Sequence, residues 1–597
     1  MTSLILNRRD IDFMLYEWLD AERLCDMPRY MDHSKETFDA SLNLCEQMAT
    51  LHFATHNKKN DANEPWFDGE NVHMIPEVKQ ALDLFSQAGL IAAGQDYEIG
   101  GMQLPTLVEK ACFAWFLAAN VGTAAYPFLT IGNANLLLAY GSQQQIDTWV
   151  LPMMQGRFFG TMCLSEPQAG SSLADIKTRA EPQADGSYRL FGNKMWISGG
   201  EHALSENIVH LVLAKIPGAP AGVKGISLFI VPRHLLDEQG NSAAHNDVVL
   251  AGLNHKMGYR GTTNTLLNFG EGKFKPAGQA GAVGWLVGEA HKGLSYMFHM
   301  MNEARIGVGL GAAALGYTGY LHSLEYARQR KQGRLPASKD PASDPVALIE
   351  HADIKRMLLA QKAYVEGGLA LNLYCARLID EERNALDEER DRLTNLLDIL
   401  TPVAKSWPSQ WCLEANNLAI QVHGGYGYTR DYNVEQFYRD NRLNPIHEGT
   451  HGIQALDLLA RKVVMNDGAN LELLMTTLLH TSNRAAKDAN LSEYASMLDA
   501  ALYKLVDVTR QLHSSGHPQL TLANATVYLE AAGHIVVAWI WLEQMIVASG
   551  KEEDFYLGKM QAGRYFFFWE LPKTGPWLDL LASLDDTCLM MNDRWFD

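Results

Sequence analysis

The sequence lacks the patterns that mark secreted, metal-binding and membrane-spanning proteins. Its seven cysteines among 597 residues form no C-x-x-C pair and show no regular spacing, so neither a disulfide framework nor a zinc site is predicted. The amino terminus carries no basic and apolar signal segment. The longest apolar run, Ile535–Leu542, stops at Glu543 and is too short to cross a bilayer. These absences lead us to expect a cytoplasmic protein that makes no membrane contact.

The chain also has fewer basic than acidic residues. The chain has 50 lysines and arginines against 69 aspartates and glutamates, which gives a formal net charge of −19. Nucleic acid and anionic membranes repel an acidic surface, so neither is expected as a main partner. A small phosphorylated ligand held by local basic residues is compatible with this balance. The hydrophobic content of 47% and the length indicate a globular protein of two to four domains.

Apolar periodicity divides the chain into helical and β stretches. The runs Tyr188–Ser198, Ile226–Val231 and Thr263–Phe269 have the composition of strands, whereas the segments before and after them follow a helical period. A polar loop at Lys331–Pro345 interrupts the later helices. We predict four domains: N-terminal helical (1–160), β (161–280), a helical bundle (281–468) and an additional C-terminal helical domain (469–597).

An acidic residue, Glu448, stands where an irregular segment meets a helix. Residues 439–449 are predicted to be non-helical because Pro445 disfavours helix before it, while the apolar residues from Ile453 onward repeat at a helical period. Glu448 is therefore expected on a loop leading into a helix N-terminus, where a presented carboxylate can act as a base. On these residues alone, an ordinary exposed acid favoured by the helix dipole is the stronger interpretation, and the case for a base depends on motifs elsewhere in the chain.

Six motifs, in order, resemble those of the acyl-CoA dehydrogenases over roughly residues 75–465. The first two are similar to the flavin-binding signatures of the family. The motifs are Met162–Ser172, Lys194–Gly200, Asn302–Gly307, Arg328–Arg334, Gln421–Tyr428 and Glu448–Thr450. The resemblance implies a mainly α fold with a central β domain: an N-terminal helical domain, a β-barrel-like domain and a four-helix bundle, here followed by an added helical domain.

The resemblance also implies a reaction that uses FAD. In the family, a carboxylate removes the α-proton of an acyl thioester while hydride leaves the β-carbon for the flavin, giving a trans-2-enoyl-CoA. Glu448 matches the family's base, and its backbone N–H and a flavin hydroxyl are expected to stabilise the developing enolate. Some branches carry the base just before the arginine of the bundle, but here that position is Ala304. Glu303 is one residue away and would point about 100° around the helix.

Further site residues follow from the matched motifs. Trp196 is expected to cover one flavin face, with a core aromatic as the alternative, and Arg305 matches an arginine on the CoA side, with a surface charge as the alternative. The family usually has threonine at two of the serine positions, and serine keeps the hydroxyl. The implied FAD contacts are Ser165, Ser171, Trp196, Ser198, Thr450 and Gly452, with Arg330, Gln332, Gln421, Gly424 and Gly425 reaching the FAD of a neighbouring subunit. The implied substrate contacts are Ser171, Arg305, Glu448 and Gly449.

Two other patterns have less specific explanations. Gly307–Gly311 resembles a dinucleotide-binding fingerprint, but no strand is predicted before it, so close helix packing is expected. His423, His447 and His451 have a spacing that suits no common metal site, and no metal is predicted.

Three functions are compared. The first is a dehydrogenase of β-oxidation that takes a medium- to long-chain fatty acyl-CoA and passes electrons to electron-transfer flavoprotein. The second is an acyl-CoA oxidase that uses oxygen. The third is a nucleic-acid-associated member of this fold, which the acidic charge disfavours. The long form resembles the branch that includes 3-methylmercaptopropionyl-CoA dehydrogenases, an alternative substrate class, and some broad-range bacterial fatty acyl-CoA dehydrogenases. The added C-terminal helices are expected to cap the bundle and to favour a homodimer.

Overall fold

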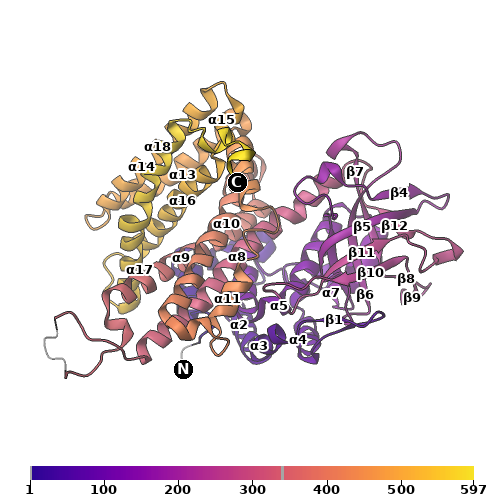
Figure 1. Cartoon of the computed structure of the whole chain (residues 1–597), viewed down its shortest axis with the longest axis horizontal. Coiled ribbons are helices and arrows are strands. Elements are labelled where there is room, and N and C mark those ends of the chain that lie inside the picture. The colour runs from indigo at the N-terminus through magenta and orange to yellow at the C-terminus, as the bar shows by residue number, and fades with distance from the viewer. Residues whose placement is uncertain (1–2, 338–341) are drawn as a thin grey trace. The chain divides into compact units, whose positions relative to one another are not determined.

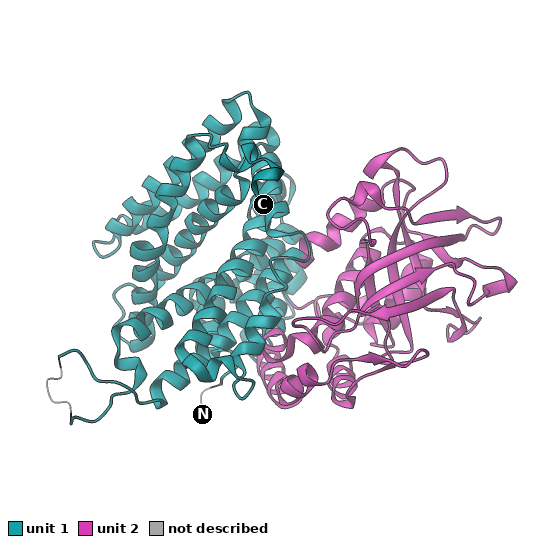
Figure 2. Cartoon of the chain, viewed as in Figure 1, with its two compact units in different colours: residues 1–39, 105–114, 305–597 teal, residues 40–104, 115–304 magenta. Residues whose placement is uncertain are grey.

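The computed structural model describes residues 3–337 and 342–597, and Figure 1 shows its helices and strands. Residues 338–341 of the predicted polar loop lie outside the described residues. The chain forms two compact units (Figure 2): one contains residues 3–39, 105–114 and 305–597, and the other contains residues 40–104 and 115–304. These units divide the chain differently from the four predicted domains, whose boundaries stay a prediction.

An eight-stranded sheet forms the centre of the second unit. Its strand order is β10-β11-β5-β12-β7-β6-β3, and β4 pairs with both β5 and β6, so β5, β12, β7, β6 and β4 close into a circuit. This topology confirms the predicted barrel-like β domain. The strands are β3 Phe158–Cys163, β4 Arg179–Pro182, β5 Tyr188–Ser198, β6 Asn207–Lys215, β7 Ile226–Pro232, β10 Val248–Leu253, β11 Asn264–Phe269 and β12 Ala282–Leu286.

The three predicted strands coincide closely with β5, β7 and β11, because each apolar run fills the interior of the barrel. Leu190, Val212, Phe229 and Leu267 are fully buried there. The helices of this unit include α3 (Ala54–Ala62), α4 (Pro76–Gln87) and most of α5 (Thr106–Tyr140). The predicted helical stretch 1–160 also contains a short hairpin, β1 (Trp66–Phe67) with β2 (Val72–His73), which the periodicity missed because each strand has two residues.

Long helices form the bundle of the first unit. They are α8 (Gly293–Gln329), α9 (Ala352–Asn384) and α10 (Asp387–His423), with α8 entering this unit at Arg305. A Cβ on Gly309 of α8 would lie 1.9 Å from the carbonyl oxygen of Ala404 on α10, so a side chain there would prevent the contact. This geometry confirms the predicted close helix packing at Gly309, the central glycine of residues 307–311.

The C-terminal helices pack on this bundle, as the sequence predicts. The indole Nε1 of Trp541 donates to the carbonyl oxygen of Ala363 on α9 (3.0 Å), and Nε1 of Trp407 on α10 donates to His534 Nδ1 (3.2 Å). The added helices are α13 (Ala469–Ala485), α14 (Ser492–Ser514), α15 (Pro518–Ala523), α16 (Ala525–Ala548), α17 (Asp554–Tyr565), α18 (Thr574–Ala582) and α19 (Thr587–Met590).

Two described helices, α5 and α16, are long and apolar enough by composition to cross a membrane. Uninterrupted apolar runs in the sequence do not reveal them, because both helices contain polar residues within an apolar average. In each helix, 83% of the apolar window is buried inside the protein, which is the environment of a core helix.

Candidate active site

Glu448 lies on a turn between two helices of the first unit. Helix α11 (Val434–Asn441) precedes it and α12 (His451–Leu456) follows it, with Thr450 as the N-cap whose side chain accepts a hydrogen bond from the N–H of Ile453. The predicted loop before a helix N-terminus is therefore confirmed. The prediction that residues from 439 onward are non-helical is wrong for its first three residues. The amphipathic helix α11 continues to Asn441, because Pro445 disfavours helix only in the residues next to it.

The backbone of this turn has an unusual conformation. Glu448 has φ +53° and Gly449 has φ +82°, and a left-handed conformation at a residue other than glycine costs on the order of 1–3 kcal/mol unless its surroundings fix it. Gln454 Nε2 donates to the carbonyl oxygen of Glu448 (3.0 Å), and Lys405 Nζ donates to the carbonyl oxygens of Asn444 and Gly449 (2.7 Å each). These contacts fix the backbone from which the carboxylate projects.

The environment of Glu448 favours a base whose proton affinity is higher than that of a solvated acid. The side chain is partly buried, and burial raises the pKa of Glu448, while the positive charges of Lys405 and Arg305 oppose that rise. Arg305 is itself buried and pairs with Asp457 through Nη1 and Oδ2 (3.0 Å). The alternative that Arg305 is a surface charge of the bundle is therefore wrong.

The alternative acid, Glu303, has other partners. Asn135 Nδ2 donates to both of its carboxylate oxygens, at 2.9 and 2.8 Å, within the second unit. Ala304, at the position where some branches carry the base, is buried and has no ionisable group. Of the acids that the sequence singled out, Glu448 is the one whose turn the structure fixes by contacts on both sides.

In the β unit, the two flavin-like signatures pair directly. The N–H of Met195 donates to the carbonyl oxygen of Ser165 (3.0 Å). Beside this bond, Lys194 Nζ donates to the carbonyl oxygen of Leu164 (2.9 Å) and to Glu166 Oε1 (3.0 Å). Burial opposes ionisation of Glu166, but the Lys194 ammonium and hydrogen bonds from Thr178 hold its pKa down at about 2. A buried ion pair thus ties one signature to the other.

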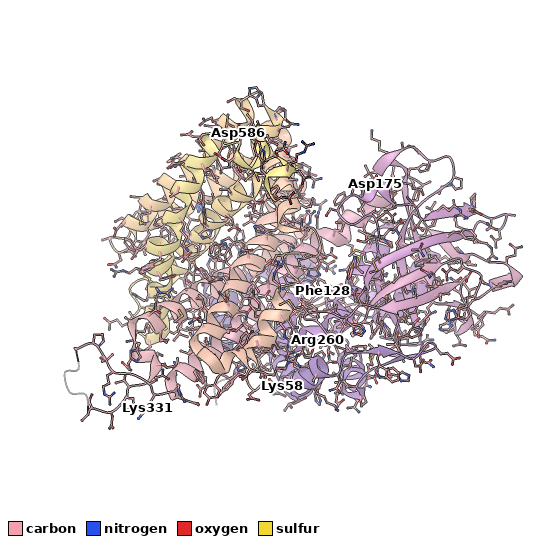
Figure 3. All side chains as sticks on the ribbon, in the orientation of Figure 1. Lys58, Phe128, Asp175, Arg260, Lys331 and Asp586 are labelled. Atoms are coloured by element: carbon pink, nitrogen blue, oxygen red, sulfur yellow. The ribbon has the colours of Figure 1, made fainter. Side chains whose placement is uncertain are left out.

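The predicted cofactor residues of this unit are accessible. Trp196 is 60% exposed and has φ +65°, which excludes the alternative of a core aromatic. Ser198 Oγ accepts a hydrogen bond from Asn264 Nδ2 (3.3 Å), and Ser171 is exposed on the loop that leads to Asp175, labelled in Figure 3. The sequence pattern alone gave no indication of the left-handed backbone at Trp196.

In the first unit, the structure brings Arg330 and the glycine-rich turn together. The Arg330 guanidinium lies over the ring of Tyr426, 5.8 Å from its centroid. The segment after α8, marked by Lys331 in Figure 3, also exposes Gln332, and Gln421 is exposed near the end of α10. Apart from the adjoining backbone and chain neighbours, no heavy atom of the described residues lies within 4 Å of a Cβ placed on Gly424, Gly425 or Gly452, so these backbones are open to a ligand.

The three histidines considered as metal ligands each contact a different group. His423 Nδ1 lies 2.8 Å from the Ala419 carbonyl oxygen, His447 Nε2 lies 3.1 Å from Asn444 Oδ1, and His451 Nε2 lies 2.8 Å from Glu530 Oε1. The part of the chain that the structure describes contains no group of three or more His, Cys, Asp or Glu that could hold a metal ion.

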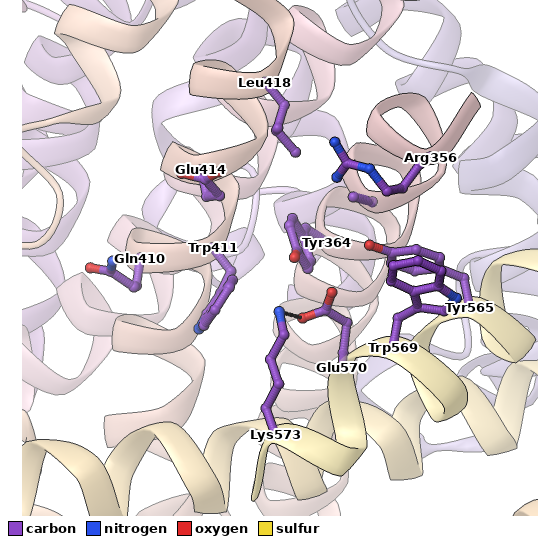
Figure 4. Close-up of a pocket in the computed structure, with 11 residues that line it drawn as sticks. Arg356, Tyr364, Gln410, Trp411, Glu414, Leu418, Tyr565, Trp569, Glu570 and Lys573 are labelled. Atoms are coloured by element: carbon purple, nitrogen blue, oxygen red, sulfur yellow. Dashed lines mark hydrogen bonds and ion pairs between the residues drawn. The ribbon is translucent and has the colours of Figure 1, made fainter. Parts of the chain in front are cut away.

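A cavity of about 390 Å³ lies elsewhere in the first unit, between α9, α10 and the end of α17 (Figure 4). Its walls carry Trp411, Trp569 and Glu414, and Lys573 pairs with Glu570 across 2.6 Å. None of the described site residues predicted from the sequence lines it. The lining of this cavity therefore shares no residue with the candidate active site.

Comparisons with known proteins agree along the chain. The sequence models for "Acyl-CoA dehydrogenase, middle domain", "Acyl-CoA dehydrogenase, C-terminal domain" and "Acetyl-CoA dehydrogenase C-terminal like" match residues 161–271, 291–463 and 475–592. The chain is 36% identical to 3-methylmercaptopropionyl-CoA dehydrogenase of Ruegeria pomeroyi, covering 83% of each chain. It is 31% identical to the broad-specificity linear acyl-CoA dehydrogenase FadE5 of Mycobacterium tuberculosis, covering 99% of each.

A solved structure has the same fold. It is an acyl-CoA dehydrogenase from Bacillus anthracis complexed with FAD, with a TM-score of 0.73 and 19% identity, and the match covers 98% of this chain and 93% of that one.

Proposed function

The chain belongs to the acyl-CoA dehydrogenase family, FAD oxidoreductases that act on CH–CH bonds, and we propose that it converts a saturated medium- to long-chain fatty acyl-CoA to the trans-2-enoyl-CoA in β-oxidation. The observation that carries this proposal is the strained, doubly anchored turn that holds Glu448 in a partly desolvated place. Such a carboxylate is suited to taking a proton from a weak carbon acid.

We assign the proton-transfer step to Glu448. Its desolvated carboxylate accepts the α-proton of the thioester, and its own backbone N–H donates to the thioester oxygen, where negative charge develops. FAD, when bound, accepts the hydride from the β-carbon. Arg305 is held by Asp457, so its positive charge stays close to the acid and opposes the rise in the pKa of Glu448 that burial causes. Ser171 and Gly449 are proposed as further substrate contacts.

The residues present fit FAD. Serine hydroxyls at 165, 171 and 198 can hydrogen-bond a polar ring system, and an exposed indole at Trp196 can cover an aromatic face. Open glycine backbones beside an arginine suit a pyrophosphate, because backbone N–H groups can approach it and guanidinium binds it bidentately. We propose that Ser165, Ser171, Trp196, Ser198, Thr450 and Gly452 bind FAD, and that Arg330, Gln332, Gln421, Gly424 and Gly425 complete the FAD site of a partner copy.

The electron acceptor and the length of the acyl chain are two further proposals about the reaction. We propose electron-transfer flavoprotein as the acceptor, and the names of the two relatives motivate both a linear fatty acyl chain and 3-methylmercaptopropionyl-CoA as substrates to test. A series of acyl-CoA chain lengths, assayed with electron-transfer flavoprotein and again with oxygen alone, distinguishes these choices. Turnover with oxygen at the rate seen with flavoprotein would identify an oxidase instead.

The cross-subunit assignment predicts a joint effect on cofactor and assembly. Arg330→Ala should lower the FAD content of the purified protein and loosen a homodimer together, because one side chain serves both. FAD per chain and sedimentation in the same preparation measure this. Arg334→Ala is the matched control on the same exposed segment, where Arg334 Nε donates to the Ser343 carbonyl oxygen, and it should change neither. A stable monomer with full FAD content would contradict the assignment.

A further inference from the structure

Lys405 is a buried cation that the sequence motifs leave without a role. It lies in the middle of α10, and its side chain has no exposed surface. A lysine in the interior carries a large desolvation cost, so its position requires compensating partners. Its Nζ donates to the carbonyl oxygens of Asn444 and Gly449, at 2.7 Å each, across 39 and 44 residues of sequence. Both acceptors belong to the turn that presents Glu448.

The two hydrogen bonds bracket the acid. Asn444 precedes Glu448 by four residues and Gly449 follows it directly, so one ammonium group fixes both ends of the turn. The carbonyl between them, that of Glu448, is fixed by Gln454 Nε2. A Cβ on Gly449 would lie 2.5 Å from that same Nε2, and φ at Gly449 is +82°, so the turn needs glycine there. The left-handed backbone of Glu448 is therefore imposed by contacts from α10 and α12.

The charges around Lys405 act on the same acid. Glu448, Arg305 and His447 are the titratable groups that face it, and Arg305 is paired with Asp457. Burial, with a further contribution from Arg305, lowers the pKa of Lys405 to about 7, while the Glu448 carboxylate opposes that drop. Burial and Lys405 together lower the pKa of His447 to about 3, so His447 is neutral and adds no competing charge. The Lys405 ammonium thus favours the ionised form of Glu448.

We infer that Lys405 is a positioning residue for Glu448: its ammonium fixes the turn that aims the carboxylate, and its charge keeps that carboxylate available as a base. This inference rests on the proposed function. It differs from a purely packing role, because a packing residue would affect stability without changing how the rate depends on pH. It also differs from a substrate contact, because both of its hydrogen-bond acceptors are backbone atoms of this chain.

The test compares Lys405→Met with wild type as FAD-loaded protein. Flavin reduction by acyl-CoA, followed anaerobically by stopped flow across a range of pH, gives a limiting rate and a substrate affinity. We expect the limiting rate to fall about 10²-fold, the loss that misplacing a catalytic group by about 1 Å produces, with substrate affinity little changed. The acid limb of the rate profile should move to higher pH, because removing a positive neighbour raises the pKa of Glu448.

The matched control is Lys462→Met. Lys462 is a buried lysine in the same unit, paired with Asp398 at 2.7 Å, and its replacement should leave the pH profile unchanged. If Lys405→Met does not accumulate as a folded flavoprotein, Lys405→Gln, which keeps an NH₂ donor group but no charge, takes its place and should show the shifted acid limb.

Three results would overturn the inference. The first is a pH profile of flavin reduction that does not shift in folded Lys405 variants. The second is an equal loss of rate in Lys462→Met. The third is failure of both Lys405 variants to fold while Lys462→Met folds, which would make Lys405 a core residue. Absence of flavin reduction by every acyl-CoA in wild type is a different failure, because it refutes the proposed function itself.

Discussion

Glu448→Gln is expected to fold and to bind FAD and acyl-CoA, while flavin reduction by substrate falls by about 10²–10⁴-fold or more. The carboxamide keeps the size of the side chain, but it cannot accept a proton at neutral pH. Because the turn is held by backbone contacts to Lys405 and Gln454, the substitution should leave its conformation intact. Anaerobic stopped-flow bleaching of the flavin measures this step without interference from an electron acceptor.

Glu303→Gln is the matched control for that experiment. Glu303 accepts two hydrogen bonds from Asn135 and lies at the neighbouring position to the alternative base, so its variant should reduce flavin within about tenfold of wild type. If instead Glu448→Gln stays within tenfold and Glu303→Gln is inactive, the base is Glu303. If Glu448→Gln fails to bind FAD, Glu448→Asp, which keeps a carboxylate, replaces it.

The same acid predicts a pH dependence. Burial raises the pKa of Glu448 above that of a solvated glutamate, and only the ionised form accepts a proton. The rate of flavin reduction should therefore be full above this raised pKa and fall as pH drops through it. The limb should be absent from the residual rate of Glu448→Gln, because no carboxylate is left to titrate at this position. A limb that persists unchanged in this variant would assign it to another group.

Lys194→Met should cost about 3–5 kcal/mol of stability in the β unit, because it leaves the Glu166 carboxylate buried without its partner. The two side chains are 0% and 3% exposed and lie 3.0 Å apart, and the pair ties the two flavin-like signatures together. We therefore expect a lower melting temperature and a lower FAD content in the same variant. Thermal unfolding and the absorbance of bound flavin measure the two effects.

Two further variants make this prediction specific. Lys177→Met removes an exposed lysine from the same segment, whose backbone N–H alone contacts Glu166, and it should behave as wild type. The double variant Lys194→Met with Glu166→Gln should recover part of the lost stability, since both charges are then gone. A single variant that loses less than about 1 kcal/mol, the value of an exposed pair, would show that the ion pair does not hold this loop.

The sequence predicts those parts of the protein in which a local pattern determines the structure. Strand β5 begins at Tyr188 and ends at Ser198 as predicted, because alternation and the flanking turn act within a few residues. The loop position of Glu448 also follows from Pro445 and the neighbouring glycines. The contacts of Lys405 could not be predicted in this way, because its acceptors lie 39 and 44 residues away. A signal was present nonetheless: Lys405 is a lone cation in an otherwise buried stretch of α10.

The left-handed backbone at two residues other than glycine was also not predictable from the sequence. Glu448 and Trp196 both have positive φ without being glycine. At Glu448, hydrogen bonds from Lys405 and Gln454 to the turn hold this conformation against local preference. The buried position of Arg305 likewise could not be predicted locally, because its ion-pair partner, Asp457, lies 152 residues further along the chain. Each of these features involves residues at or beside the proposed site.

The most direct test of the account is anaerobic titration of the purified wild-type flavoprotein with saturated acyl-CoAs of increasing chain length. The account predicts that at least one of them bleaches the flavin, with one trans-2-enoyl-CoA formed for each flavin reduced. A protein that takes up FAD but stays oxidised with every acyl-CoA would contradict it, and so would a protein that cannot be loaded with FAD at all.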